Sequence, residues 1–169
     1  MVFYYLDASA LVKYYILEPG STWVRTLVNL SVSGSGPQAT YILISEASIA
    51  ECAAAFAILF RTHRISLRAR DGAFRAFMRD IAYGLFQLIP VLTADFHTAA
   101  HLTQRHPLKA YDAVQLAVAL RCQQALGPIP MLLTFVSGDR ALLAAAQAEG
   151  LPTDNPFDHI APEDRPRPS

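Results

Sequence analysis

Hydrophobic positions along the chain follow two patterns, short unbroken apolar runs and longer stretches with helical spacing. The short runs predict β-strands at residues 2–6, 40–44, 86–92 and 131–136. The longer stretches predict helices at residues 8–17, from 21 to about 30, 45–64, 66–83, 93–105, 107–126 and 139–149. Because strands alternate with helices, the pattern predicts an α/β fold with a mainly parallel sheet.

Breaks in the pattern occur where turn-forming residues gather. Glu18-Pro19-Gly20-Ser21 separates the first two predicted helices, and residues 31–38 form a Ser/Gly/Pro loop. No linker divides the chain, so we expect one domain over residues 1–161. Residues 162–169 are rich in Pro and Arg and are expected to be a frayed tail.

Composition narrows the class of protein. The chain has 169 residues, of which 53% are hydrophobic and 17% charged, with a formal net charge of zero. These values exclude a disordered chain and argue against a protein that coats nucleic acid by charge alone. An apolar chain without net charge favours association with itself or a partner. No apolar stretch is long enough to cross a membrane, and the N-terminus lacks the features of a signal peptide.

The two cysteines, Cys52 and Cys122, have no disulfide-framework spacing. We therefore expect them to be buried, reduced thiols in a cytoplasmic protein.

Four acidic residues at separate places are the candidates for chemistry. Asp7 follows the first predicted strand, and Asp139 follows the last. Glu51 and Asp112 lie in helical segments among apolar neighbours. A carboxylate in apolar surroundings is costly unless it is paired or bound to a cation, so a shared divalent metal ion is the simplest explanation. Carboxylates without imidazole or thiolate partners favour magnesium or manganese.

Each acid also has a purely structural interpretation. Asp7 and Asp139 precede helices and suit the N-cap position. Ser48-Ile49-Ala50-Glu51 fits a capping box if the helix begins at Ser48, whereas a start at Ser45 places Glu51 in the second turn. Glu46 is a rival for the role of Glu51.

Asp112 has a structural alternative of its own, an ion pair with Lys109 one turn away. His97 and His101, with Asp95 nearby, share a helix face and form a second, weaker candidate for metal binding.

Four segments in sequence order resemble the motifs of PIN-domain proteins. They are Tyr5-Leu6-Asp7-Ala8-Ser9 through Gly20, Ser45 to Glu51, Leu108 to Ala113, and Phe135-Val136-Ser137-Gly138-Asp139-Arg140-Ala141-Leu142. Together they span nearly the whole chain, and the resemblance is greatest to the VapC-type toxins of bacterial toxin–antitoxin pairs.

This resemblance implies a three-layer PIN-like fold with helices on both faces of the sheet. It also implies a Mg²⁺- or Mn²⁺-dependent ribonuclease with one or two ions and the catalytic acids Asp7, Glu51, Asp112 and Asp139. Asp7, Asp112 and Asp139 are the expected metal ligands, supported by Ser9 and Ser137. Some relatives carry a further acid where this chain has Leu142, which leaves the number of metal ions open.

Partners are expected from the same resemblance: an RNA substrate, a small cognate antitoxin and a second copy of the chain. A basic group suited to RNA consists of Arg61, Arg64, Arg68 and Arg70, with Arg75 and Arg79. For any single arginine, a solvated helix face is the better explanation, and the interpretation as an RNA route applies to the group. The first two predicted helices carry more apolar residues than one sheet obviously covers, which favours a partner that covers them. A well-packed core within the chain explains these residues equally well.

Three other functions remain open at this point. A haloacid-dehalogenase-type phosphotransferase also begins with an Asp after its first strand, but it requires a second Asp where this chain has Ser9. A PIN scaffold that only binds RNA or protein is expected to have lost some of the acids. A free-standing RNA-processing nuclease would have no antitoxin.

Overall fold

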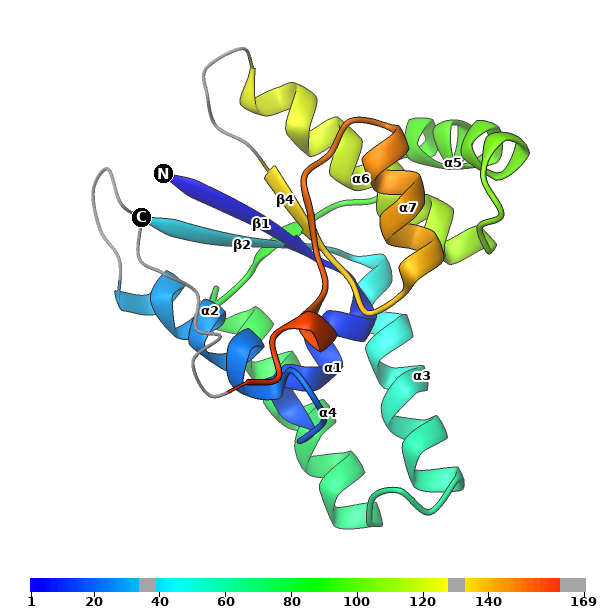
Figure 1. The fold of residues 1–169 in the computed structure, drawn as a ribbon. Coiled ribbons are helices and arrows are strands. Elements are labelled where there is room, and N and C mark those ends of the chain that lie inside the picture. Colours follow the sequence, from blue (N-terminus) through cyan, green and yellow to red (C-terminus); the bar gives the residue numbers. More distant parts are fainter. Residues whose placement is uncertain (34–38, 128–132, 162–169) are drawn as a thin grey trace.

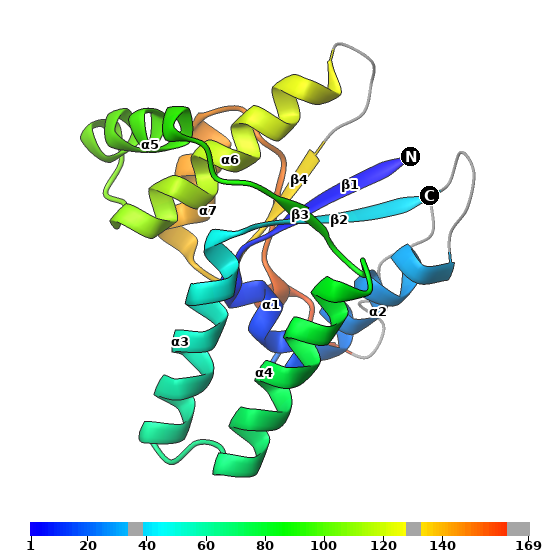
Figure 2. The same ribbon diagram turned by 180° about the vertical axis from the view of Figure 1, so that it is seen from behind.

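Five parallel strands form the central sheet of the chain. The computed structural model describes residues 1–33, 39–127 and 133–161. The sheet has the order β3-β2-β1-β4-β5, and every neighbouring pair runs parallel (Figures 1 and 2). The strands are β1 (Val2–Leu6), β2 (Thr40–Ser45), β3 (Gln87–Ile89), β4 (Leu133–Val136) and β5 (Thr153–Asp154).

Helices cover both faces of this sheet, as the resemblance implied. The helices are α1 (Ala8–Tyr15), α2 (Ser21–Ser33), α3 (Ala47–Arg61), α4 (Leu67–Ala82), α5 (Thr93–Arg105), α6 (Ala110–Leu126) and α7 (Arg140–Ala148), with a short 3₁₀ helix, η2 (Pro156–Asp158), near the end. Helices α1 to α4 lie on one face and α5 to α7 on the other (Figure 1).

Side chains of β1 alternate between the two faces because successive residues of a strand point in opposite directions. Phe3 and Tyr5 join the core formed with α5 to α7, whereas Leu6 joins the core formed with α1 to α4. Both cores are therefore built around the same strand, and the chain just after it is held from both sides.

The apolar residues of α1 and α2 are covered within the chain. Leu11, Val24 and Leu27 are fully buried in the core beneath α1 to α4, together with Trp23 and Val28. The structure supports the well-packed core for these residues, because α3 and α4 pack against α1, while α1, β2 and η2 pack against α2. Cys52 and Cys122 are free and buried, as predicted.

Some boundaries of helices and strands differ from those predicted from the sequence. The strand predicted at 86–92 is limited to Gln87–Ile89 at the sheet edge, because Pro90 has no N–H to donate. The helix predicted from residue 107 begins at Ala110, after Lys109 in extended backbone. Strand β5 was missed because two residues show no periodicity. Residues 131–132 of the last predicted strand and the tail at 162–169 lie outside the described residues.

None of the described helices is long and apolar enough to cross a membrane.

Candidate functional site

The site begins where the carboxyl ends of β1 and β4 meet. Leu6 is in register with Val136, and the backbone N–H of Asp7 donates to the carbonyl oxygen of Val136 (3.1 Å). Parallel pairing places Asp7 beside Ser137, although 130 positions separate them in the sequence. In an open α/β sheet, ligands bind at the carboxyl ends of the strands, where these residues lie.

Asp7 is held by several donors at once. It caps α1 through the backbone N–H of Ala10 (2.9 Å), and it accepts from the hydroxyls of Ser9 (2.7 Å) and Ser137 (2.7 Å). The side chain is only 5% exposed. Burial raises the pKa of Asp7 to about 6, against the lowering effect of these donors and with a further increase from the charge of Asp112. The capping interpretation is thus confirmed, and it does not account for the second oxygen and its two hydroxyl donors.

The turn after β4 continues the same network. The backbone N–H of Gly138 donates to Ser9 Oγ (2.7 Å), and that of Asp139 donates to Ser137 Oγ (3.0 Å). A Cβ atom at Gly138 would come within 3.1 Å of the Phe157 ring and 3.3 Å of Ser9 Oγ, so a larger residue in this turn would require these neighbours to shift by a few tenths of an ångström. Ser9 and Ser137, predicted as supporting residues, therefore link both strand ends.

Asp139 caps α7 and remains exposed. Its carboxylate accepts from the backbone N–H groups of Ala141 (2.8 Å) and Leu142 (3.2 Å). One oxygen makes both bonds, which leaves the other oxygen of an exposed carboxylate facing solvent.

Glu51 approaches from the other side of the sheet end, on α3. The helix begins at Ala47, so Glu51 lies in its second turn and the capping-box interpretation with Ser48 was wrong. Its carboxylate instead accepts a short hydrogen bond from the side-chain amide of Gln115. Burial raises the pKa of Glu51 to about 7, while the bond from Gln115 lowers it and the charges of Asp7 and Asp112 raise it.

Asp112 lies in the first turn of α6 and is half-buried. Burial raises its pKa, as does the charge of Asp139, while Lys109 opposes the change. Lys109 thus contributes only part of the electrostatic environment of Asp112, and a simple surface ion pair does not account for the residue.

All four predicted acids interact electrostatically. The charge of Asp7 raises the pKa of Glu51, the charge of Asp112 raises those of Asp7 and Glu51, and Asp139 acts on Asp112. The rival Glu46 bonds the backbone N–H of Val91 (3.3 Å) instead. Carboxylates that raise one another's pKa repel one another through space, and a bound cation would relieve that repulsion.

The acids are not already arranged as a finished ion site. Within the described ranges, no three His, Cys, Asp or Glu side chains lie close enough together to hold a metal ion. The donors nevertheless fit a hard divalent cation in kind, since each is a carboxylate or hydroxyl oxygen. The weaker candidate at His97 and His101 loses its acid, because the Asp95 carboxylate is buried against Arg121 (2.8 Å).

One residue of this region was missed by the sequence analysis. Gln115 is 1% exposed and touches Glu51, Tyr5, Ser45 and Ser48. The available signal was an amide inside an apolar helix three residues after Asp112, on the same helix face.

A groove of about 410 Å³ adjoins the acids between α1 and α3. Its polar lining comes from Ser9, Glu18 and Asp139, and Gly138 also borders it. The rest of the wall is mainly apolar and includes Val12, Ala55, Ile58, Leu59 and Phe157. Lys13 is buried in it, paired with Glu18 (3.2 Å) and lying 3.7 Å from the centre of the Phe157 ring.

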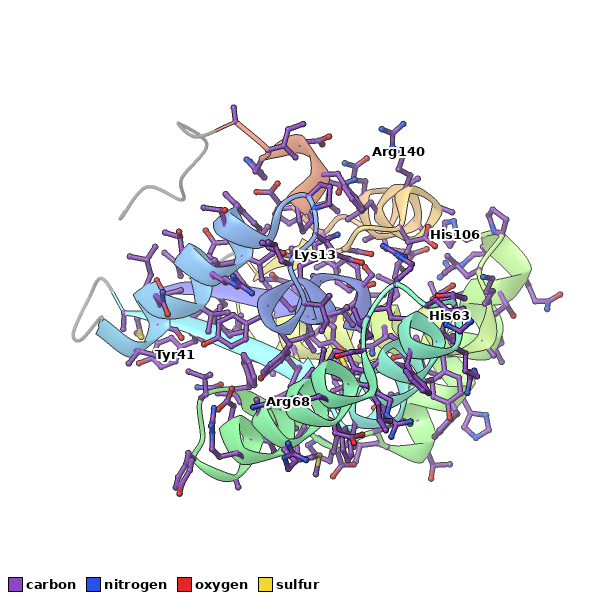
Figure 3. All side chains as sticks on the ribbon, turned by 90° about the horizontal axis from the view of Figure 1, so that it is seen from below. Lys13, Tyr41, His63, Arg68, His106 and Arg140 are labelled. Carbon is purple, nitrogen blue, oxygen red and sulfur yellow. The ribbon has the colours of Figure 1, made fainter. Side chains whose placement is uncertain are left out.

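The predicted basic group spreads over α3, α4 and their connection. Arg64 pairs with Glu18 (3.0 Å), and Arg70 pairs with Asp71 (2.7 Å). Arg61 and Arg68 are exposed. Figure 3 shows Arg68 and Arg140 on opposite sides of Lys13 in the view from below. Arg61 lies ten residues after Glu51 on α3, or roughly 15 Å along the helix, so this group flanks the acids at a distance.

Comparisons with known proteins agree with this architecture. A family model described as PIN domain matches residues 4–127. None of the curated proteins compared with the chain matches it.

Solved structures are similar over most of their length. A structure of FitAB bound to IR36 DNA has a TM-score of 0.61 at 17% identity, covering 92% of this chain and 96% of that one. VapC20 of Mycobacterium tuberculosis, described as a sarcin-ricin loop cleaving toxin, has a TM-score of 0.56 at 16% identity, covering 88% and 95%. A toxin–antitoxin complex from Klebsiella pneumoniae has a TM-score of 0.52 at 17% identity, covering 90% and 97%.

Proposed function

Because the chain belongs to the PIN domain family, we propose that it is a metal-dependent endoribonuclease, the toxin of a toxin–antitoxin pair. The observation that carries this proposal is the convergence of four acids from distant parts of the sequence on one end of the sheet. The charges of Asp7, Asp112 and Asp139 each raise the pKa of another of these acids there, and a purely structural set of caps would not require this.

The roles follow from the surroundings of each acid. Asp7, Asp112 and Asp139 are the proposed ligands of Mg²⁺ or Mn²⁺, and the hydroxyls of Ser9 and Ser137 fix the orientation of Asp7. A bound divalent ion would supply charge to activate water and to stabilise the leaving oxygen of the phosphodiester. Glu51, with a pKa of about 7, is suited to accept a proton from the attacking water near neutral pH.

The test is a cleavage assay on protein freed of metal by a chelator. Labelled RNAs of several structures are incubated with Mg²⁺, Mn²⁺ or Ca²⁺ at increasing concentration, and a duplex DNA is the control. We expect RNA cleavage that depends on Mg²⁺ or Mn²⁺ and is lost again with excess chelator. Binding of RNA without cleavage under every metal condition would favour the non-catalytic scaffold instead.

The exposed arginines are the proposed route for RNA to this site. Replacing Arg61 and Arg68 with alanine removes two charges with little effect on packing. We expect weaker RNA binding and a salt dependence of log K reduced by about 1.4, because each phosphate contact to a single strand contributes about 0.7. A fluorescence titration of a catalytically inactive variant over a range of salt concentrations measures both quantities.

A control with the same charge change is available. Arg79, which the sequence grouped with the other arginines, pairs with Asp80 (2.9 Å), and Arg105 pairs with Glu149 (3.1 Å), so both charges are already compensated within the chain and neither belongs to the proposed route. The Arg79→Ala/Arg105→Ala variant should retain the wild-type salt slope. Equal slopes for both double variants would remove the assignment of Arg61 and Arg68.

The groove beside the acids is the proposed place for an antitoxin segment. Its walls are mainly apolar, and Ile58 in the wall is 51% exposed. The Asp139 carboxylate in its lining favours a basic side chain from the partner. We also propose a homodimer, as the resemblance implies. Co-expression with a small protein encoded beside the chain should give a complex that no longer cleaves RNA, and Ile58→Asp should release it. Light scattering of the chain alone decides between dimer and monomer.

A further inference from the structure

The side-chain amide of Gln115 lies between the two faces of the fold. Gln115 belongs to α6, on the face covered by α5 to α7, whereas Glu51 belongs to α3 on the opposite face; Figure 2 shows both helices. The amide nitrogen of Gln115 donates to the Glu51 carboxylate. The carbonyl oxygen of the amide accepts from Tyr5 Oη (2.6 Å) and Ser45 Oγ (3.0 Å). Its nitrogen donates to Ser48 Oγ (3.0 Å) and to Glu51 Oε2.

All hydrogen-bonding positions of this amide are therefore used. A glutamine side chain offers two acceptor sites and two donor hydrogens, and each has a partner here. The amide is 1% exposed, so water does not compete for these positions. A fully bonded, buried amide has one orientation and little freedom to move.

Glu51 determines which way the amide points. Turning the amide by 180° would place its carbonyl oxygen against the Glu51 carboxylate, so that two acceptors would face each other. It would also remove the acceptor now used by the Tyr5 and Ser45 hydroxyls. The carboxylate and the two hydroxyls thus fix the amide, and the amide in turn fixes the carboxylate.

The arrangement links two of the acids as well. Gln115 follows Asp112 by three residues and shares its helix face, while its amide bonds Glu51. We infer that Gln115 is a positioning residue. The hydrogen bond from its amide nitrogen fixes the orientation of the Glu51 carboxylate relative to the other acids. This inference rests on the proposed ribonuclease function for its catalytic consequence, and the hydrogen bond itself can be tested without RNA.

The cleavage test compares Gln115→Met with Tyr5→Phe. Methionine has a similar size but no donor, so Glu51 loses its bond. Phenylalanine at position 5 removes a bond to the same amide but leaves the one to Glu51. We expect kcat to fall about 10- to 100-fold in Gln115→Met with KM nearly unchanged, as for other residues that orient a catalytic group. The kcat of Tyr5→Phe should stay within about threefold of wild type, because Ser45, Ser48 and Glu51 still fix the orientation of the amide.

A double-variant cycle separates positioning from stability. If Gln115 acts through Glu51, adding Gln115→Met to Glu51→Ala causes no further fall in kcat. Equal losses in Gln115→Met and Tyr5→Phe, or a full additional loss in the Glu51→Ala background, would overturn the inference. Melting curves of every variant in chelator show whether each chain is folded.

A metal-free measurement covers the case in which Gln115→Met does not fold. In wild-type protein, we expect the side-chain amide protons of Gln115 to exchange slowly with solvent and one of them to resonate far downfield. Glu51→Ala should move that resonance, because the acceptor is gone. An unchanged resonance would show that no bond to Glu51 exists. If the wild type cleaves no RNA, the proposed function fails while this comparison still decides on the bond.

Discussion

Asp7→Asn and Asp112→Asn are each expected to lower metal-dependent RNA cleavage by about 100-fold or more while the chain stays folded. Each substitution replaces a charged oxygen donor with an amide of the same shape. A metal ion contributes several kcal/mol to a phosphodiester transition state, and each 1.36 kcal/mol is tenfold in rate. Asn caps helices about as well as Asp, so the bond from Ala10 to position 7 survives. Single-turnover cleavage with Mg²⁺ or Mn²⁺ measures the loss.

Glu46→Gln is the matched control for these variants. Glu46 lies at the same end of the sheet but bonds the Val91 backbone rather than joining the four acids. Its variant should cleave RNA at a rate close to wild type. Full activity in both Asp7→Asn and Asp112→Asn would exclude the metal site, whereas equal losses in all three variants would indicate a general disturbance.

Without metal, the stability of the wild-type chain should contain a component that decreases as pH rises from about 4 to 7. The pKa of Asp7 is about 6 in the folded chain against an ordinary value of 3.8, and that of Glu51 is about 7 against 4.5. Between these values the folded chain holds protons that the unfolded chain has released, so stability falls with increasing pH. The Asp7 contribution is therefore complete below 3.8 and is lost as pH passes through about 6.

Comparison with Asp7→Asn isolates this contribution from the other acids. The shift of about two pH units at Asp7 corresponds to about 3 kcal/mol, at 1.36 kcal/mol per unit. We expect wild type to lose roughly that amount relative to Asp7→Asn between pH 4 and 8 in chelator, as measured by denaturant unfolding. Glu51 should add to the fall in both proteins, with its contribution reduced by solvent screening.

Metal gives an independent check on the same acids. Adding Mg²⁺ or Mn²⁺ at pH 8 should stabilise wild type more than Asp7→Asn, because a ligand that binds only the folded chain stabilises it. In chelator, a difference in unfolding free energy between wild type and Asp7→Asn that stays constant from pH 4 to 8 would contradict the burial of an ionisable Asp7.

Much of the fold could be predicted because the local pattern and the tertiary structure agree. The run Val2–Leu6 is bounded by a polar residue that also caps α1, and α5 occupies the range predicted from its spacing. The exact limits of the edge strand β3 and the existence of the two-residue β5 could not be predicted in this way. The limits of both strands depend on the neighbouring strands and, for β3, on Pro90. Segments of two or three residues are also too short to show an alternation of apolar and polar positions.

The candidate site was predictable in part for the same reason. Asp7 and Asp139 follow strands, and parallel strands bring their carboxyl ends together whatever the intervening sequence. Glu51 and Asp112 were identified because acids among apolar neighbours need a partner. Gln115 escaped notice because an amide in a helix has many ordinary uses, and its partners come from three other elements.

The sequence by itself determined the α/β class and the central apolar strands, and it suggested the four candidate acids, because these depend on periodicity and residue type along short stretches. Only the tertiary structure decided that Glu51 meets Gln115 rather than its own helix start, and that the apolar residues of α1 and α2 are buried in one core with α3 and α4. The tertiary structure alone also decided that a groove lined by Asp139 and Glu18 adjoins the acids. Each of these facts depends on contacts between segments distant in the sequence, whose geometry is set by packing of the whole core.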